Sequence, residues 1–247
     1  PVGGLQGNVL LEEECEDNQR LISLHVKRTG ARIDIVENGQ QAVKEGLAGR
    51  FDLILMDLQM PVMDGIQAIT LLRQTGYSGP IVALTANAMK SARETCIGVG
   101  ADDYLTKPID LERFYNVLRT YLNSDTNTNK KIPAKTAGLT SDPEFQALVQ
   151  SFLENIPHML QEVACALDKK QWAEACSVAH KLKGLGGGFG FPEITLIAAE
   201  LNQNLKDKQI KLAKSAFSEL VAICQKIYTS RNLPLFHVTQ CNQQAVS

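Results

Sequence analysis

Short runs of apolar residues alternate with longer amphipathic segments over the first half of the chain. The apolar runs lie at residues 9–11, 33–36, 53–56 and 81–84, with a weaker run at 103–105. Between and after them, apolar residues recur with helical spacing near residues 18–29, 39–48, 65–74, 87–98 and 110–122. Strands that alternate with helices form βαβ units, whose right-handed crossovers produce a parallel sheet covered on both faces. The pattern therefore predicts an α/β flavodoxin-like five-stranded parallel sheet with strand order 2-1-3-4-5.

The second half of the chain, residues 141–231, shows only helical periodicity. Apolar spacing predicts helices near residues 143–155, 157–168, 171–187, 192–205 and 208–230. Because proline disrupts a helix interior, Pro157 is expected to break or kink the first pair. These segments predict an all-α up-and-down helical bundle with four helices at its core. The polar stretch between the halves, residues 123–140, is predicted to be a linker.

Composition and charge exclude several classes of protein. With 247 residues, 44% of them hydrophobic and 21% charged, the chain is typical of packed globular protein and most simply forms two domains. Since no apolar run approaches the roughly 18–20 residues of a membrane span, no membrane contact is expected. Residues 1–127 carry 12 Lys+Arg against 17 Asp+Glu, and residues 128–247 carry 13 against 10. Such small excesses predict no nucleic-acid binding.

The start of the chain and its cysteines bear on its cellular context. Residues 1–4, PVGG, form neither a signal peptide nor an initiator methionine, so the chain is expected to be a piece of a longer protein. The six cysteines include no CxxC pair. They therefore predict neither a zinc site nor a disulfide framework, and reduced thiols are expected.

Polar side chains cluster at the predicted carboxyl ends of the strands. Residues 12–14, all glutamate, follow the first strand, and Asp57 ends the third. Carboxylates that converge in this way repel one another unless they share a hard cation such as Mg²⁺, although strand-end acids also cap helix N-termini. The fourth strand ends at Thr85 and the fifth leads into Lys107. An acid cluster, a hydroxyl and a lysine on adjacent strand ends favour a phosphoryl site.

In these motifs, residues 8–122 resemble the response regulator receiver domain. The matching motifs are Glu13-Glu14, residues 57–65 (DLQMPVMDG), Thr85-Ala86 and Lys107-Pro108. The resemblance implies that Asp57 accepts a phosphoryl group whose oxygens contact Thr85 and Lys107. It also implies a Mg²⁺ ion that is held by Glu14, Asp57 and the main-chain carbonyl of Gln59, with Glu13 reaching it through water. A cis peptide at Lys107-Pro108 follows from the same resemblance.

Two features of this half leave alternatives open. Tyr104 resembles the family's switch aromatic, with Ala86 among the switch and docking residues, but a tyrosine in a strand is more often simply packed. Glu14 and Cys15 stand where the family usually has Asp and Asn. The longer arm of Glu14 is expected to weaken Mg²⁺ binding, because Mg²⁺ demands near-ideal octahedral geometry. A degenerate receiver that serves as a docking or inhibitory scaffold, without phosphorylation of Asp57, is therefore the alternative function.

In the second half, one predicted helix carries a histidine opposite its apolar face. At about 100° per residue, His180 lies among small residues, including Gly184 and Gly187, with Lys183 at one flank. A lone histidine on a helix is commonly just a solvated surface residue. Glycines, however, cost about 0.8–1 kcal/mol each in a helix, so several together indicate a surface that is cleared for a docking partner.

Residues 141–231, which include AHKLKG at 179–184, resemble the histidine phosphotransfer (Hpt) domain. The resemblance implies that His180 accepts a phosphoryl group, that Lys183 steadies its charge and that Gly184 permits close approach. A receiver followed by an Hpt domain resembles the C-terminal part of a hybrid sensor histidine kinase. Residues 1–7 are then a linker from its catalytic part and residues 232–247 a loose tail.

This resemblance implies a relay that runs through Asp57 and His180. The expected partners are the phosphoacceptor domain of an upstream histidine kinase and the receiver of a separate response regulator. A cytoplasmic location is expected, with an inner-membrane anchor in a longer parent protein as one option. The chain offers neither a Gly-rich loop nor a Walker motif for ATP, so no ATP-binding kinase core is predicted in it.

Overall fold

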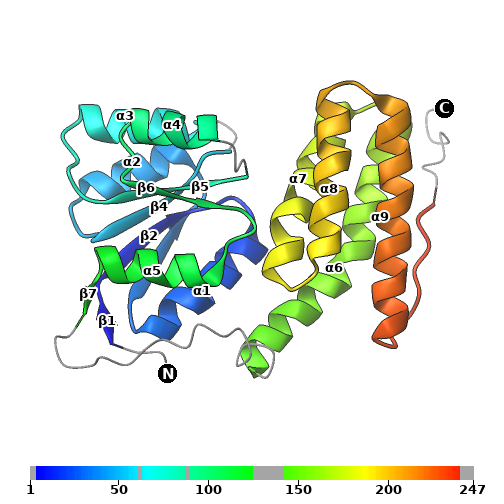
Figure 1. Ribbon diagram of the computed structural model, residues 1–247, viewed down its shortest axis with the longest axis horizontal. Helices are drawn as coiled ribbons and strands as arrows, with labels where there is room; N and C mark the ends of the chain where they lie inside the picture. Colours follow the sequence, from blue (N-terminus) through cyan, green and yellow to red (C-terminus); the bar gives the residue numbers. More distant parts are fainter. Residues whose placement is uncertain (1–3, 60–62, 87–89, 125–141, 240–247) are drawn as a thin grey trace, which may run out of the picture. The chain divides into compact units, whose positions relative to one another are not determined.

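The computed structural model of the chain describes residues 4–59, 63–86, 90–124 and 142–239 (Figure 1). The chain divides into two compact units, Pro1–Phe145 and Gln146–Ser247. The first contains a parallel sheet with helices, and the second contains helices. Most of the predicted linker at residues 123–140 lies outside the described residues, as do the beginning of the helix predicted at 87–98 and the end of the C-terminal tail.

The predicted flavodoxin-like sheet is confirmed. Its five strands are β2 (Asn8–Glu12), β3 (Arg32–Val36), β4 (Leu53–Asp57), β5 (Ile81–Thr85) and β6 (Asp103–Thr106). They are parallel and lie in the order β3-β2-β4-β5-β6. Since β2 and β4 are neighbours that continue to opposite edges of the sheet, the carboxyl ends of these two strands form the topological switch point.

Helices cover both faces of this sheet. Figure 1 shows α1 (Glu16–Thr29) and α5 (Leu111–Tyr121) on one face, with α2 (Gly39–Leu47), α3 (Gly65–Gln74) and α4 (Lys90–Gly98) on the other. Successive strand residues alternate between two buried clusters, so Leu55 packs toward α1 and α5 whereas Ile54 packs toward α2 and α3. Both faces of the central strands are therefore apolar, which explains why the strands read as continuous hydrophobic runs.

Side-chain caps fix where several helices begin. Asn38, Asp64 and Asp110 each accept a hydrogen bond from the backbone N–H three residues later, at the starts of α2, α3 and α5. These contacts satisfy amide groups that have no partner within the helix. The caps at Asp64 and Asp110 start the helices that directly follow the loops after Asp57 and Lys107.

Two segments that the sequence assigns to linkers pair with each other. β1 (Leu5–Gln6) and β7 (Asn123–Ser124) form an antiparallel pair, with Leu5 opposite Ser124. Leu5 is buried against the cluster beneath α1 and α5. The chain therefore enters and leaves the sheet unit at one place, where the two segments are joined by backbone hydrogen bonds.

The second unit contains the predicted helical bundle. Its helices are α6 (Pro143–Asp168), α7 (Trp172–Gly188), α8 (Pro192–Lys206) and α9 (Ile210–Ser230). The turn from α7 to α8 is a Schellman motif, because Gly190 has a φ of 87° and the Phe191 N–H donates to the Gly186 carbonyl. Phe189 in this turn stacks on Phe152 of α6. Within the described parts of the chain, no helix is long and apolar enough to cross a membrane.

Of the two effects expected at Pro157, a break is wrong, because α6 continues through it, and a kink stays a prediction. Proline has no N–H, so the Leu153 carbonyl four residues earlier loses its helical partner. The Tyr228 hydroxyl of α9 donates a hydrogen bond to that carbonyl. Tyr228 is 4% exposed, and burial, followed by the neighbouring Cys224 and Glu154, raises its pKa to about 12. A tertiary contact thus replaces the missing helical bond.

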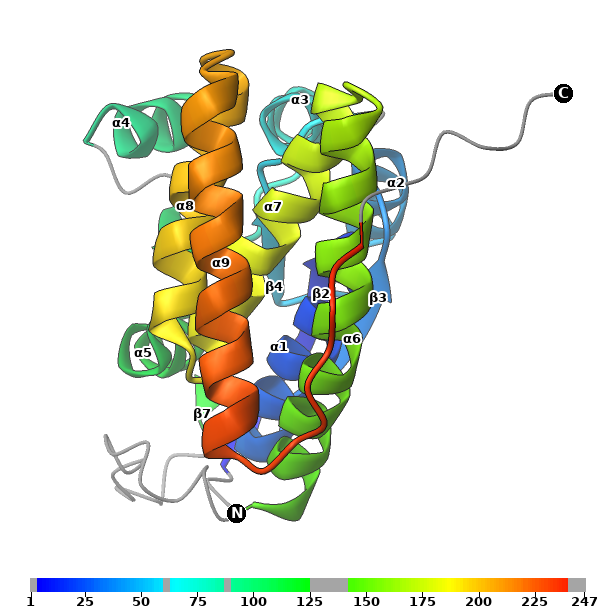
Figure 2. The same cartoon turned by 90° about the vertical axis from the view of Figure 1, so that its right-hand side faces the viewer.

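The expected loose tail is also wrong for residues 233–239, which dock on the bundle (Figure 2, red). The Gln161 side chain of α6 donates to the Thr239 carbonyl at 2.8 Å and accepts from the Thr239 N–H at 2.9 Å. Phe236 packs edge-on against Tyr228. Cys165, one turn after Gln161, is disulfide-bonded, so the expectation of reduced thiols is wrong at this position.

We predict that Tyr228→Phe lowers the free energy of unfolding by about 1–3 kcal/mol, because the buried Leu153 carbonyl loses its donor. The matched background is Pro157→Ala, which restores an N–H in α6 and should reduce the effect of Tyr228→Phe. Urea unfolding of the parent, both single variants and the double variant measures this coupling. Equal losses in the two backgrounds would show that Tyr228 does not compensate for the proline.

Candidate functional site

The structure brings four of the predicted site residues together at the carboxyl edge of the sheet. Asp57 ends β4 and Thr85 ends β5, while Glu13 follows β2 and Lys107 follows β6. All four are buried, with exposures of 3%, 4%, 2% and 8% in that order. Their convergence follows from the parallel sheet, whose strand ends meet at one edge.

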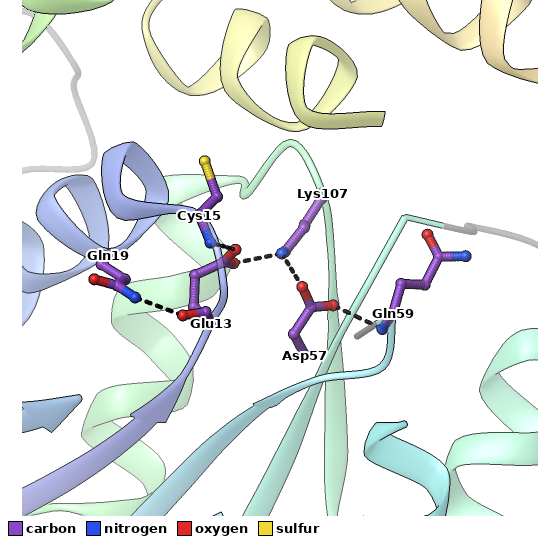
Figure 3. A network of polar contacts seen from close by, with 6 residues as sticks. All are labelled: Glu13, Cys15, Gln19, Asp57, Gln59 and Lys107. Carbon is purple, nitrogen blue, oxygen red and sulfur yellow. Dashed lines mark hydrogen bonds and ion pairs between the residues drawn. The ribbon is translucent and has the colours of Figure 1, made fainter. Parts of the chain in front are cut away.

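Lys107 joins two of the carboxylates directly (Figure 3). Its Nζ lies 2.5 Å from Glu13 Oε2 and 2.6 Å from Asp57 Oδ2. Burial alone would lower the pKa of Lys107, but the charges of Asp57 and Glu13 outweigh it and raise that pKa above its ordinary value. The lysine is therefore a permanent cation between two buried acids.

Backbone contacts fix the positions of these side chains. The Gln59 N–H donates to Asp57 Oδ1 at 3.1 Å, and the Lys107 N–H donates to the Thr85 carbonyl at 2.7 Å. A Cβ at Gly65 would lie 2.1 Å from the Asp57 carbonyl oxygen, so only glycine allows α3 to begin this close to Asp57. The Lys107-Pro108 peptide is cis, as the sequence predicts.

The three consecutive glutamates occupy three different environments. Glu13 contacts Lys107, whereas Glu14 is exposed. Glu12 is fully buried, and neither of its carboxylate oxygens makes a hydrogen bond within the described residues. Burial, followed by the charges of Asp57 and Glu13, raises the pKa of Glu12 to about 9. Glu12 is therefore neutral at physiological pH, and the sequence alone did not separate it from its neighbours.

The residues predicted to hold Mg²⁺ are only partly gathered. Glu13 and Asp57 both contact the Lys107 ammonium. Their buried carboxylate oxygens are also the kind of ligand that a hard divalent ion such as Mg²⁺ prefers. Gln59 is exposed, and its backbone is adjacent to Asp57 through the N–H contact. Among the described residues, however, no three His, Cys, Asp or Glu side chains form a ready metal-binding group. Glu14 is exposed, whereas Glu13 and Asp57 are buried.

Of the predicted switch residues, Ala86 directly follows β5 and Tyr104 lies within β6, opposite Ala83 of β5. Tyr104 and Ala86 are both half-buried. The guanidinium of Arg113 lies over the Tyr104 ring, 4.6 Å from its centroid, and donates to the Tyr104 carbonyl at 2.9 Å. Arg113 also pairs with Asp103 at 3.2 Å. Sequence reasoning missed Arg113, because its contacts cross from α5 to an edge strand.

In the second unit, α7 carries His180, Lys183, Gly184 and Gly187, all half-buried. On α7, Ala175, Ala179, Leu182, Leu185 and Gly186 are buried, whereas Trp172 and Val178 are half-buried. The sequence predicts that His180 is exposed to solvent on the side of the helix opposite the apolar face. His180 is instead half-buried, and α8 contacts the same side of α7 at Cys176 and Gly187.

The other described histidines have different surroundings. His25 is buried, bonded to the Tyr115 hydroxyl at 2.9 Å, and burial with the charge of Arg28 lowers its pKa to about 4. His158 is exposed and lies 3.7 Å from Glu162, while His237 is on the exposed side of the docked tail. Among these residues, only His180 combines a half-buried position with the predicted lysine and glycines on the same helix.

Comparisons with known proteins agree with the two units. The family model described as the response regulator receiver domain matches residues 9–119, and the Hpt domain model matches residues 147–230. The signal transduction histidine-protein kinase BarA of Escherichia coli is 28% identical over 218 residues, which cover 80% of this chain and 24% of BarA. This chain therefore spans about a quarter of the length of that relative.

Two further matches each cover just under half of this chain. Hybrid signal transduction histidine kinase I of Dictyostelium discoideum is 37% identical over 123 residues, 46% of this chain and 7% of that protein. A solved receiver domain of a Pseudomonas aeruginosa sensor histidine kinase, with a magnesium ion coordinated in its active site cleft, is 36% identical. The match covers 47% of the present chain and 97% of the solved receiver domain, with a TM-score of 0.44.

We predict that Glu12→Gln stabilises the first unit at pH 8 by roughly 4–5 kcal/mol and has little effect at pH 4, because each pH unit above the ordinary glutamate pKa costs the folded parent about 1.4 kcal/mol. The ordinary pKa of glutamate is 4.5, and that of Glu12 in the folded chain is about 9. As the pH rises between these values, the unfolded chain ionises first, so Glu12 makes the folded state progressively less stable. Urea unfolding followed by circular dichroism at several pH values measures the difference.

The matched control for this prediction is Glu14→Gln, because Glu14 is the exposed neighbour of the buried acids. Glu12→Gln should raise the stability at pH 8 by more than Glu14→Gln does. A Glu12→Gln variant whose stability runs parallel to that of the parent between pH 4 and pH 9 would show that the Glu12 carboxyl is ionised in the folded chain.

Proposed function

Because this chain belongs to the two-component signalling proteins, with a receiver domain followed by an Hpt domain, we propose that it relays a phosphoryl group from Asp57 to His180. The observation that carries the proposal is the buried Asp57 carboxylate held by Lys107 at 2.6 Å. The receiver and Hpt models that match this chain, together with its similarity to histidine kinases, support a phosphorelay module. The roles of individual residues below are part of the proposal.

Asp57 is suited to be the first acceptor. One of its oxygens contacts Lys107 and the other accepts the Gln59 N–H. In the first step an Asp57 oxygen attacks the phosphorus of a phosphohistidine, so the donor's nitrogen–phosphorus bond breaks as an oxygen–phosphorus bond forms. Lys107 and the Thr85 hydroxyl would then hold the phosphoryl oxygens, with Lys107 offsetting part of their negative charge.

The charges at the site support binding of a divalent cation. Two ionised carboxylates share one ammonium, which leaves an excess negative charge before the doubly charged phosphoryl group arrives. We propose that Glu13, Glu14, Asp57 and the main-chain carbonyl of Gln59 hold Mg²⁺. When bound, Mg²⁺ would neutralise charge on the phosphoryl oxygens.

His180 is proposed as the second acceptor. A nitrogen of its neutral imidazole carries a lone pair and no proton, so it attacks the phosphorus without a general base. The oxygen–phosphorus bond breaks and Asp57 regains its carboxylate. Lys183, three residues later on the same side of the helix, would steady the phosphoryl charge, and the half-buried Gly184 and Gly187 would leave room for a docking receiver.

The partners follow from this order of transfer. An upstream histidine kinase would supply the phosphohistidine, and the receiver of a separate response regulator would remove the phosphoryl group from His180. We propose a cytoplasmic location for this exchange. Tyr104 and Ala86 would report the state of Asp57 at the surface, since Ala86 directly follows Thr85 and Tyr104 lies on the neighbouring strand three residues before Lys107.

One observation favours a second function. Glu14 is exposed, and the described side chains include no ready group of three metal-binding residues. A receiver that cannot hold Mg²⁺ would serve as a docking or inhibitory scaffold without phosphorylation of Asp57. The intact contacts among Asp57, Lys107 and Glu13 favour the relay.

We predict that acetyl phosphate with Mg²⁺ adds a phosphoryl group to Asp57 of the full chain, followed by an acid-labile, base-stable phosphate on His180. Asp57→Asn should abolish both adducts, and His180→Gln should remove only the second. Asp34→Asn, which changes an exposed acid on β3, is the matched control and should label like the parent. Intact-mass measurement and acid lability read out the adducts. Labelling that persists in Asp57→Asn would contradict the assignment of the acceptor.

We predict that Glu14→Asp lowers the Mg²⁺ dissociation constant roughly tenfold, about 1.4 kcal/mol, because the shorter arm suits the octahedral ion. Titration with Mg²⁺ in the presence of beryllium fluoride measures the constant. Glu16→Asp, on the exposed first turn of α1, is the control and should bind like the parent. An unchanged or weaker affinity for Glu14→Asp would mean that the strand end is already adapted to glutamate. No saturable signal from any variant at high millimolar Mg²⁺ would support the scaffold.

A further inference from the structure

The hydroxyl of Thr195 on α8 is inserted into the hydrogen-bond ladder of α7. It accepts a hydrogen bond from the Gly187 N–H at 2.7 Å and donates one to the Lys183 carbonyl at 3.0 Å. These are the two groups that a regular α-helix joins to each other, since residue 187 is four positions after residue 183. Thr195 is 9% exposed. A buried side chain of α8 thus determines the backbone geometry of α7 at this turn.

The local sequence is built for this insertion. A Cβ at Gly186 would lie 2.8 Å from Thr195 Oγ1 and 2.9 Å from the Thr195 backbone nitrogen, so a larger residue would push α8 away. The Phe191 N–H holds the Gly186 carbonyl at 2.7 Å, which keeps the start of α8 beside the end of α7. Gly186 therefore serves the contact between two helices of this unit rather than an incoming partner.

The turn that carries His180 is held from both ends by α8. Thr195 binds the Lys183 carbonyl, three residues after His180. At the other end, the Asn202 side-chain amide donates to the Cys176 carbonyl at 2.8 Å, four residues before His180. Asn202 is 5% exposed. Because both side chains are buried and bonded, they restrict the backbone from which His180 and Lys183 project.

We infer that Thr195 is a positioning residue for phosphoryl transfer at His180, acting through Lys183. Its hydroxyl fixes the Lys183 backbone so that the lysine ammonium lies beside the phosphoryl group. Thr195 need not touch the reacting atoms for this role. The inference rests on the proposed function, because it assigns Lys183 a part in that transfer.

The test measures the rate at which phosphohistidine forms on His180 in the full chain after Asp57 is phosphorylated with acetyl phosphate and Mg²⁺. Thr195→Val removes the hydroxyl and keeps the side-chain shape. It should slow transfer by between about tenfold and about a hundredfold, as small misplacements of reacting groups do. Thr195→Ser, which keeps the hydroxyl, should transfer near the parent rate.

Two controls separate positioning from packing. Thr229→Val removes a threonine hydroxyl that binds the Gln225 carbonyl on α9, and it should transfer at the parent rate. In a Lys183→Ala background, Thr195→Val should add little to the loss, because both changes act on the same contact. If Thr195→Val does not fold, Thr195→Ala compared with Thr195→Ser isolates the same hydroxyl.

Several outcomes would overturn the inference. A folded Thr195→Val variant that transfers at the parent rate would refute it while leaving the relay intact. Slow transfer by Thr195→Ser, or full additivity with Lys183→Ala, would show that packing or another route is responsible. Absence of phosphohistidine on His180 in the parent would refute the proposed relay and this inference together.

Discussion

Lys107 places one buried positive charge where the ends of four strands meet. Its side chain binds Glu13 after β2 and Asp57 at the end of β4, while its backbone binds Thr85 at the end of β5. Without this cation, two buried carboxylates would face each other unpaired, and such charges strongly destabilise a folded chain. The position of Asp57 and the charge available to a ligand both depend on this contact.

The same edge shows how position within a strand changes the chemistry of identical residues. Glu13 is paired with the lysine. Glu12 is buried, its carboxylate oxygens make no hydrogen bond to the residues that the structure describes, and its pKa is about 9. Side chains alternate along β2, so Glu12 lies on the same face of the sheet as Leu10, which packs in the cluster beneath α2 and α3. Glu13 lies on the opposite face. One acid therefore contributes charge to the site, while the other reduces the stability of the fold as the pH rises.

In the helical unit, side chains from other helices complete the backbone hydrogen bonding. Tyr228 binds the Leu153 carbonyl that Pro157 leaves without a helical partner. Thr195 and Asn202 bind the carbonyls of Lys183 and Cys176 on either side of His180. Each contact satisfies a buried polar group and couples two helices at a defined position. The helix that carries His180 is thus positioned by α8 as well as by its apolar face.

The order and type of the main elements, and the residues at the strand ends, could be predicted from the amino-acid sequence. Hydrophobic periodicity is a local property of the sequence, so it predicted the five strands, the helices between them and the helical second half. The parallel topology then implied that Asp57, Thr85, Lys107 and an acid after the first strand lie close together. Other features became known only from the three-dimensional structure. They are the glutamate that contacts Lys107, the hydrogen bond that replaces the one lost at Pro157, the docking of residues 233–239, and the hydrogen bonds of Thr195 to the backbone of α7. These features depend on contacts between residues far apart in the chain, and periodicity within one segment carries no information about such partners.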